Sequence, residues 1–178
     1  PERLAGLATL EEAGADRIHA TALGVGERVG NAEMDLLLVN LNLLGAHRRD
    51  LSRLPEYCAL VAESVGLPIP ANYPVFGADA FRTGTGVHAA AIIKAKRKGD
   101  DWLANRVYSS VPAEELGLAQ KIEISPLSGL SNVKHWLATH GYDAEDATAC
   151  KVLFDAAKRT DHVLSEEECR GLLKVACR

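Results

Sequence analysis

The 178-residue sequence lacks several features that would assign it to a special class of protein. It contains no apolar run near the roughly 18 residues that a membrane-spanning helix needs, and no charged segment followed by an apolar one leads it. Basic residues are not in excess, since 20 Lys and Arg stand against 24 Asp and Glu. We therefore expect a cytoplasmic protein with neither a membrane nor a nucleic acid as partner.

Cysteine is also scarce, and the four thiols show no C-x-x-C spacing. They are Cys58, Cys150, Cys169 and Cys177. In a cytoplasmic protein this pattern favours reduced thiols, in the core or on the surface, over a disulfide or a metal site.

What the sequence does contain is typical of a globular protein, with 47% hydrophobic and 25% charged residues. Residues 4–13 have the apolar spacing of a helix, and Gly14 is placed to end it. A short strand over residues 16–21, a glycine-rich turn over 24–31 and an apolar helix over 34–44 follow. Helix, strand, turn and helix in this order are typical of an α/β barrel or an open parallel sheet.

The rest of the sequence is predicted to be mainly helical. A helix over residues 54–65 is ended by Gly66, and the proline-rich segment 67–74 then marks a linker or domain boundary. The elements after it are an irregular stretch over 77–86, helices over 87–98, 131–140, 144–159 and 166–176, and a short strand over 121–124. Ser165 and Glu168 have the spacing of a capping box for the last helix.

The turn over residues 24–31 is the first candidate site, because its glycines let the backbone approach a ligand. Asn31 stands just before an apolar helix, where it acts either as the N-cap or as an oxygen ligand for a hard divalent cation. Glu27 and Arg28 have no helix face to occupy. Arg28 is suited to clamp a carboxylate and Glu27 to accept a proton, and a plain surface ion pair between them is the alternative.

His88 is the second candidate, since it opens a helix directly after a Gly-Thr-Gly segment. The positive end of the helix dipole disfavours a protonated imidazole, and a neutral histidine suits general acid or base work. A histidine that is merely near a helix start is equally compatible with the pattern. The basic end of the same helix is either solvated or attracts phosphates such as those of coenzyme A, and its residues are Lys94, Lys96, Arg97 and Lys98.

These residues resemble a known family. Residues 26–31 read Gly-Glu-Arg-Val-Gly-Asn, and Asn72-x-Pro74-Val75-x-Gly77 and Gly86-Val87-His88 follow downstream. The motifs are similar to those of the 2-isopropylmalate synthase, homocitrate synthase and citramalate synthase group. The resemblance covers roughly the first hundred residues well and the rest in outline.

The resemblance implies an α/β fold that is only part of a larger one. Residues 1–50 would supply the final strand–helix unit of a TIM barrel, 51–75 a helix and proline-rich linker, and 76–178 small, mainly helical C-terminal subdomains. The other barrel strands would come from a missing N-terminal segment, and a helix that starts in mid-pattern at Pro1 fits such a fragment. A homodimer is implied as well.

The implied activity is an acyl transfer in amino-acid biosynthesis, such as that of leucine. The methyl group of acetyl-CoA is deprotonated and adds to the ketone of a 2-oxo acid, and the thioester is then hydrolysed. A divalent metal, Mg²⁺, Mn²⁺ or Zn²⁺, holds the 2-oxo acid. The fragment alone is expected to be inactive.

The same resemblance assigns roles to particular residues. Asn31 matches a metal-site asparagine, Glu27 and Arg28 a catalytic charged pair beside it, and His88 a catalytic histidine that the second subunit contributes. Substrate binding is implied for Thr21, Gly24, Gly26 and Gly30. Around His88 the sequence departs from the family pattern, because the usual polar neighbours are replaced. The alternative is a non-catalytic piece that docks on or regulates a partner barrel.

Overall fold

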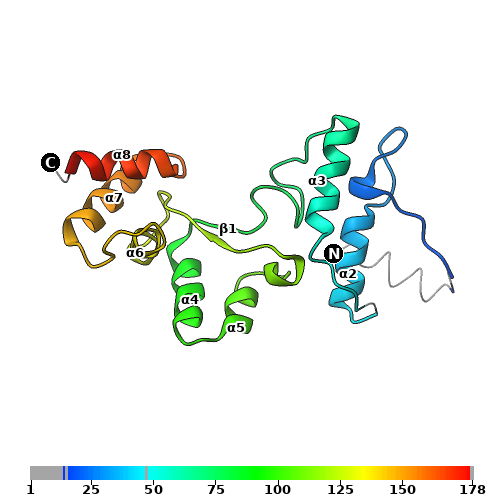
Figure 1. Cartoon of the computed structure of the whole chain (residues 1–178), viewed down its shortest axis with the longest axis horizontal. Helices are drawn as coiled ribbons and strands as arrows, with labels where there is room; N and C mark the ends of the chain where they lie inside the picture. Colours follow the sequence, from blue (N-terminus) through cyan, green and yellow to red (C-terminus); the bar gives the residue numbers. More distant parts are fainter. Residues whose placement is uncertain (1–13, 15, 47, 177–178) are drawn as a thin grey trace. The chain divides into compact units, whose positions relative to one another are not determined.

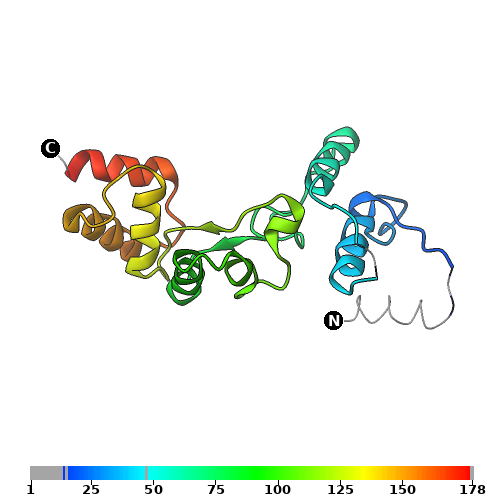
Figure 2. The same cartoon turned by 60° about the horizontal axis from the view of Figure 1, so that its bottom comes forward.

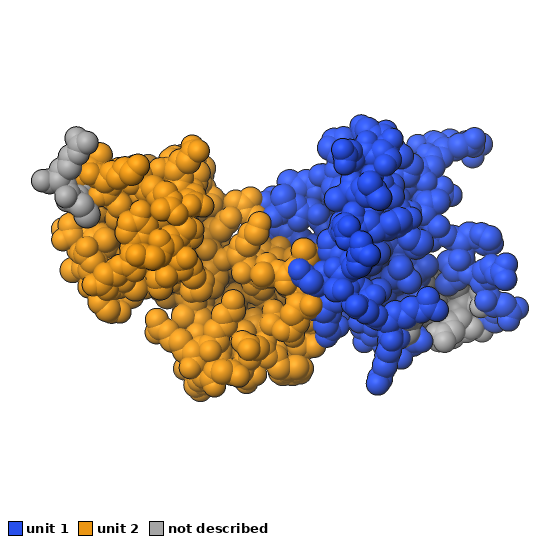
Figure 3. All heavy atoms as spheres, in the orientation of Figure 1, with its two compact units in different colours: residues 1–80, 115–117 blue, residues 81–114, 118–178 orange. Residues whose placement is uncertain are grey.

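The computed structural model describes residues 14, 16–46 and 48–176, and the chain divides into two compact units (Figure 3). Unit 1 comprises residues 1–80 and 115–117, and unit 2 comprises residues 81–114 and 118–178. The helix expected over residues 4–13 lies outside the described residues. In the described part, no helix combines the length and the apolar character needed to cross a membrane.

Unit 1 contains the helical elements η1 (Ala22–Gly24), α2 (Met34–Leu43) and α3 (Leu54–Val65), shown in Figure 1. Helix α3 forms over the predicted residues because its local signals agree: Pro55 lies in the first turn, and Gly66 ends the helix with a left-handed φ of 69°. Its buried side chains recur every fourth residue and form one packed face, made of Leu54, Cys58 and Ala62.

The strand expected over residues 16–21 does not form. Residues 17–20 have no regular secondary structure, and the only pairing in this segment is an isolated parallel bridge between Thr21 and Glu33. A strand is held by hydrogen bonds to a neighbouring strand, and no described segment provides a ladder next to this one. The residue types favoured a strand, but they do not supply its partner.

Unit 2 contains a small parallel sheet made of β1 (Arg82–Thr83) and β2 (Lys121–Ile122). Arg82 pairs with Lys121 and Thr83 with Ile122, and an Arg82–Glu123 ion pair of 2.7 Å continues the contact. The β1 strand lies in the stretch that was expected to be irregular, and β2 covers only the first half of the strand expected over 121–124. A two-residue strand has too few residues for a sequence pattern to show.

The helices of unit 2 are α4 (Gly86–Arg97), α5 (Asp101–Arg106), α6 (Leu130–Thr139), α7 (Ala147–Arg159) and α8 (Glu166–Ala176). A short 3₁₀ helix, η2 (Ala113–Leu116), lies between α5 and β2 in the chain. Helix α5 was not predicted from the sequence, and α7 begins at Ala147 rather than at 144. The capping box of α8 is confirmed, since Glu168 N–H donates to Ser165 Oγ (3.2 Å) and Ser165 N–H donates to Glu168 Oε2 (2.7 Å).

The main core of unit 2 lies among α6, α7 and α8, which Figure 2 shows gathered together. Its buried members include Val133, Trp136, Leu137, Leu153 and Leu173. Two thiols belong to the same core, Cys150 and Cys169, while Cys58 is buried in unit 1. All three are free, and burial raises the pKa of Cys58 to about 12 and that of Cys169 to about 11. A place in the core is thus confirmed for these three, and Cys177 lies outside the described residues.

Candidate functional site

The glycine-rich turn over residues 24–31 is closed by its own backbone. Asn31 N–H donates to Gly24 O (2.8 Å), and Thr21 N–H donates to Ala32 O (3.0 Å). Thr21 O in turn accepts the Met34 N–H that begins α2 (2.8 Å), while its hydroxyl donates to Val25 O (2.7 Å). The two ends of the turn are therefore fastened to each other at the start of α2.

The glycines of the turn are required by this closure. Gly24 and Gly30 have left-handed φ values of 66° and 101°. A Cβ on Gly30 would collide with Gly24 O, one on Gly26 with the Asn31 side chain, and one on Gly24 would lie 2.9 Å from Asn31 O. These glycines were expected to let the backbone approach a ligand, and the close contacts within the turn give them a first, purely structural reason.

The charged residues of the turn point to solvent. Glu27 and Arg28 are both exposed, and neither forms an ion pair with a residue in the described ranges. The surface ion pair that stood as the alternative for these two residues is therefore wrong. Arg28 also has a left-handed φ of 57°, a conformation that costs a non-glycine residue about 1–3 kcal/mol. Such strain is common at ligand sites, and here it holds a cationic side chain out of the turn.

Asn31 is not the N-cap of α2. The N-cap position is taken by Glu33, whose side chain makes no capping hydrogen bond, because the bridge to Thr21 fixes the chain there before the helix begins. Asn31 Nδ2 donates instead to Val25 O (3.2 Å), and Asn31 Oδ1 has no hydrogen-bond partner among the described residues. The side chain is exposed, so its amide oxygen is accessible to a cation or a substrate.

Asp35 is a buried residue that the sequence analysis missed. Its side chain is fully buried, and Oδ1 accepts the Leu23 N–H (2.7 Å) while Oδ2 accepts the Tyr73 hydroxyl (2.8 Å). Burial and this hydrogen bond to Asp35 raise the pKa of Tyr73. The available signal was that Asp35 is the only charged residue of a mainly apolar helix. Asp35 thus ties η1, next to the turn, to the proline-rich segment around Tyr73.

His88 lies in the first turn of α4, and its ring is half-buried. It stacks on Tyr108, with ring centroids 4.0 Å apart and planes at 24°. Tyr108 has a left-handed φ of 60°, so its backbone bends sharply where the ring meets the histidine. The sequence analysis missed Tyr108 because the two residues are brought together by the fold and not by a spacing motif.

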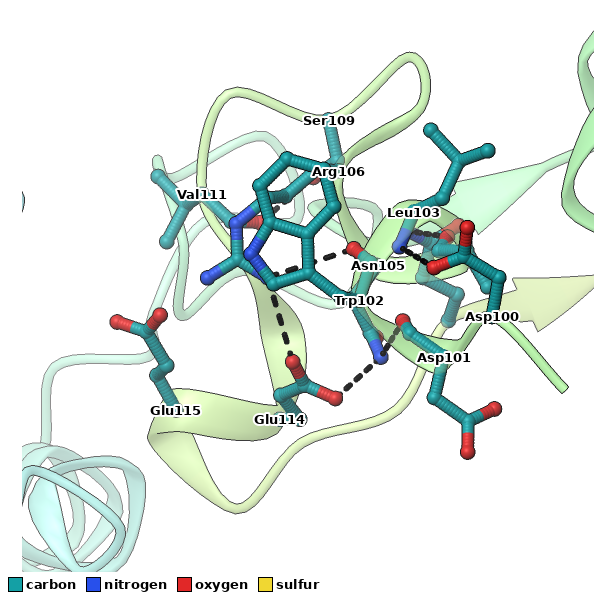
Figure 4. Close-up of polar contacts among 12 residues, drawn as sticks. Asp100, Asp101, Trp102, Leu103, Asn105, Arg106, Ser109, Val111, Glu114 and Glu115 are labelled. Carbon is teal, nitrogen blue, oxygen red and sulfur yellow. Dashed lines mark hydrogen bonds and ion pairs between the residues drawn. The ribbon is translucent and has the colours of Figure 1, made fainter. Parts of the chain in front are cut away.

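The segment that carries Tyr108 is braced by α5, as Figure 4 shows. Asn105 Nδ2 donates to Glu114 Oε2, and Arg106 forms an ion pair of 3.4 Å with the same carboxylate. Ser109 Oγ donates to Val111 O (2.6 Å) and closes the bend after the tyrosine. Arg106 also lies over the Trp102 ring at 4.8 Å. These contacts fix both ends of the short loop around Tyr108.

The turn that precedes His88 is held by a buried polar network. The carbonyl oxygen of Gly84 accepts from Ser128 Oγ (2.7 Å), Ser125 Oγ (3.0 Å) and Asn132 Nδ2 (3.4 Å). All three side chains are buried. A Cβ on Gly86 would lie 2.6 Å from Gly129 N, so the two loops approach more closely than any other residue type permits. The start of α4 is therefore fixed by residues about forty positions further along the chain.

The predicted site residues fall into two groups. Unit 1 brings together Thr21, Gly24, Gly26, Glu27, Arg28, Gly30 and Asn31, whereas His88 belongs to unit 2. No cluster of three or more His, Cys, Asp or Glu side chains within residues 14, 16–46 and 48–176 has the geometry to hold a metal ion. Among the described residues, Asn31 Oδ1 is an exposed oxygen without a hydrogen-bond partner, and it can supply one ligand to a metal site completed by other groups.

Comparison with known proteins shows one family of synthases. The chain is 34% identical to the (R)-citramalate synthase of Aquifex aeolicus over 154 residues, which is 84% of this chain and 28% of that protein. It is 31% identical to a probable 2-isopropylmalate synthase of Ignicoccus hospitalis over 168 residues, which is 92% of this chain and 40% of that protein. The homocitrate synthase of Pyrococcus horikoshii is 29% identical over 148 residues. No family model matches the chain.

These matches identify the family of the chain. It belongs to the family of citramalate, isopropylmalate and homocitrate synthases, which confirms the resemblance seen in its motifs. The chain spans between 28% and 40% of the length of these relatives.

Proposed function

We propose that the chain is the C-terminal portion of an acyltransferase that condenses acetyl-CoA with a 2-oxo acid. The observation that carries the proposal is the match to a citramalate synthase over 84% of the chain, and the Gly26 to Asn31 motif and His88 in the sequence support it. The reaction is a Claisen-type condensation: the acetyl methyl carbon loses a proton and bonds to the ketone carbon, and water then cleaves the thioester to release coenzyme A. Amino-acid biosynthesis in the cytoplasm is the setting that such a reaction implies.

In this proposal residues 16–43 are the last strand and helix of a TIM barrel that an N-terminal segment completes. Two observations support it. Residues 17–20 have no strand partner in the described part of the chain, and they lie beside an open hollow of about 360 Å³. Its lining includes Ile18, Met34, Leu37, Leu38 and Leu41. Barrel active sites lie at the C-terminal ends of the strands, which is where the turn over 24–31 follows residues 16–21.

The turn then forms one wall of the substrate site. Arg28 clamps the carboxylate of the 2-oxo acid, and Glu27 accepts or orients a proton during the condensation. Substrate contact is proposed for the backbone and small side chains around them, at Thr21, Gly24, Gly26 and Gly30. A divalent metal, Mg²⁺, Mn²⁺ or Zn²⁺, would polarise the ketone when bound, and the contribution of this chain is the Asn31 amide oxygen.

His88 supplies general acid or base catalysis in the proposed reaction. Its place in the first turn of α4 puts it at the positive end of the helix dipole, and the Tyr108 ring restricts its orientation. The proposal includes a homodimer in which His88 of one subunit reaches the turn of the other.

The test is an acyltransferase assay on the full-length protein. Coenzyme A thiol release is measured with acetyl-CoA, a panel of 2-oxo acids and Mg²⁺ or Mn²⁺, for the wild type and for His88→Ala. Loss of a general acid or base costs about 10²–10⁴-fold in rate. A matched control is His162→Ala, whose exposed ring lies between α7 and α8 and is expected to leave the rate unchanged.

Two further variants separate the roles within the turn. Asn31→Ala should raise the metal concentration needed for half-maximal activity, whereas Arg28→Gln should raise the KM for the 2-oxo acid. Full activity in His88→Ala would remove that residue from the mechanism. No thiol release with any 2-oxo acid would favour the non-catalytic docking piece, and the panel of acids identifies the substrate where activity is found.

A further inference from the structure

Unit 2 contains a basic groove between α4 and α6, and the α4 cations that line it lie toward the end of the helix opposite His88. It encloses about 440 Å³. The groove is lined by Ala90, Ile93, Lys94, Arg97, Lys98, Leu130, Ser131 and Lys134. Half of these residues are cationic, and none is acidic. This volume lies within the roughly 300–1,000 Å³ of typical small-molecule pockets.

Most of the positive charge in the groove is not neutralised. Lys94, Arg97 and Lys98 form no ion pair with any residue that the structure describes. Only Lys134 has an acidic partner, Glu145, at 2.5 Å. The nearest acidic residue along the chain, Asp100, accepts the Leu103 N–H at the start of α5 (2.9 Å). Three cationic side chains thus line one wall of the groove without a counter-charge.

The ordinary reason for basic residues at a helix end does not account for this arrangement. Lysines there often hydrogen-bond the last carbonyl groups of the helix. In α4 three of the last four carbonyls already accept from backbone donors: Lys94 O and Ala95 O accept from Lys98 N–H, and Lys96 O accepts from Gly99 N–H. No hydrogen bond from the Lys94, Arg97 or Lys98 side chain to these carbonyls is formed among the described residues.

The pKa of a neighbouring histidine, His135, depends in part on the positive charges at this end of α4. The pKa of His135 is lowered, first by burial and then by the charges of Lys96, Arg97 and His140. His135 is not a lining residue of the groove, but the charges of Lys96 and Arg97 act on its imidazole, so a negative charge bound beside Arg97 should change its pKa.

We propose that this groove binds the phosphate groups of a phosphorylated small molecule. Several cations around one hollow favour a ligand with several negative charges, and phosphoryl oxygens match the paired N–H groups of arginine. Ile93, Ala90 and Leu130 give the groove an apolar floor on which the organic part of a nucleotide-sized ligand rests. The site needs only unit 2, and it does not depend on the proposed acyl transfer.

Binding of three probes to the full-length protein tests the site: inorganic pyrophosphate, ATP and coenzyme A, each measured by calorimetry at low and high salt. The variant is Arg97→Gln/Lys98→Gln. Its matched control is Lys151→Gln/Lys174→Gln, which removes the same charge from exposed positions on α7 and α8. We expect Kd to rise about tenfold for each neutralised groove cation, and to be unchanged in the control.

The probes also identify the source of the phosphate. Pyrophosphate binding as tight as that of ATP and coenzyme A would mean that phosphate alone is recognised, and tighter binding of one of the larger molecules would name the ligand class. Saturable binding that the groove variant loses and the control keeps supports the proposal for each of them. No saturable binding of any probe, or an equal Kd in the variant and the control, overturns it.

A second readout locates the bound phosphate. In the wild type, saturation with pyrophosphate should raise the pKa of His135 measured by NMR, because the added negative charge offsets Lys96 and Arg97. The shift should disappear in the groove variant. Binding without any shift at His135 would place the phosphate elsewhere. Neither measurement uses thiol release, so failure of the acyltransferase proposal and failure of this one are distinguishable.

Discussion

The turn over residues 24–31 in unit 1 and the turn over 84–88 in unit 2 both use glycine to enter a helix, but they are held in different ways. The first is closed by its own backbone and leaves Glu27, Arg28 and Asn31 in solvent. The second is fixed through the Gly84 carbonyl by buried side chains from a distant loop. The exposed first turn keeps its polar side chains available to ligands. The buried contacts of the second turn instead fix the position of one side chain, that of His88.

The largest expected effect comes from breaking the buried network at Asn132. Its Nδ2 donates to Glu123 O (2.9 Å) and its Oδ1 accepts the Gly129 N–H (3.2 Å). Asn132→Ala leaves these backbone groups buried without partners, and we expect it to lower the free energy of unfolding of unit 2 by about 2–4 kcal/mol. Urea unfolding followed by the fluorescence of the two tryptophans of unit 2, Trp102 and Trp136, measures it. The exposed Asn72→Ala is the matched control, and an equal small loss in both variants would show that the network does not hold the second turn.

The closure of the first turn is broken most directly at Gly30. Alanine there meets both a φ of 101° and a collision with Gly24 O, whereas Gly45, with a φ of 75°, has open space around it. We expect Gly45→Ala to cost about 1 kcal/mol and Gly30→Ala about 1–3 kcal/mol. Hydrogen exchange of the Asn31 and Met34 amides, both bonded within the turn, measures the local cost. Equal exchange in the two variants would contradict the close approach at Gly30.

The difference between the turns also explains what could be predicted from the sequence. Helix α3 and the capping box of α8 depend on residues within a few positions of each other, and both were predicted correctly. The segment 16–21 was predicted as a strand and is not one, because a strand depends on a partner outside the pattern. Asn31 was placed correctly in the turn but not at the helix cap, since a bridge from Thr21 to Glu33 decides where α2 begins.

The candidate site divides in the same way. The residues of the first turn could be identified together because they are adjacent in the sequence. A hydrogen bond joins Asp35 to Tyr73 across 38 residues of sequence. Ring stacking joins His88 to Tyr108, which follows a helix that was not predicted. No local spacing signals such pairs. The roles of the site residues in catalysis and binding stay predictions.

A smaller effect is expected at the stacked rings of His88 and Tyr108, which lie directly after the second turn and after α5 in the chain. Tyr108→Phe keeps the ring and should leave the pair intact, whereas Tyr108→Ala removes a contact worth about 0.5–1.5 kcal/mol. The measurement is the NMR ring-current shift of the His88 protons together with the unfolding midpoint. An unchanged His88 signal in Tyr108→Ala would mean that the stack does not fix the imidazole. In the acyltransferase assay, Tyr108→Phe should accordingly be closer to wild type than Tyr108→Ala.

The smallest effect concerns an exposed polar cluster between α7 and α8, which is the solvent-facing counterpart of the buried network in unit 2. His162 lies 3.0 Å from Glu168 Oε1 and 3.2 Å from Asp161 Oδ1. Hydrogen bonds to Glu168 and then to Asp161 raise the pKa of His162 above its ordinary value of 6.5. The contribution of His162 to the free energy of unfolding is therefore fully present below about pH 6.5, and it is lost as the pH rises through the raised pKa of the folded state.

Glu168 gives the opposite dependence. The Ser165 N–H and then His162 lower its pKa to about 2, so its contribution is present above pH 4.5 and disappears as the pH falls toward 2. Thermal unfolding of the wild type should show a slight decline of the midpoint above pH 6.5, and His162→Gln should abolish that decline and reduce the acid limb to the part that the Ser165 hydrogen bonds supply. The exposed His19→Gln serves as the control. The effect is small because solvent screens this exposed cluster far more than the buried contacts around Gly84. A decline of the midpoint that persists in His162→Gln would assign the alkaline loss of stability to another group.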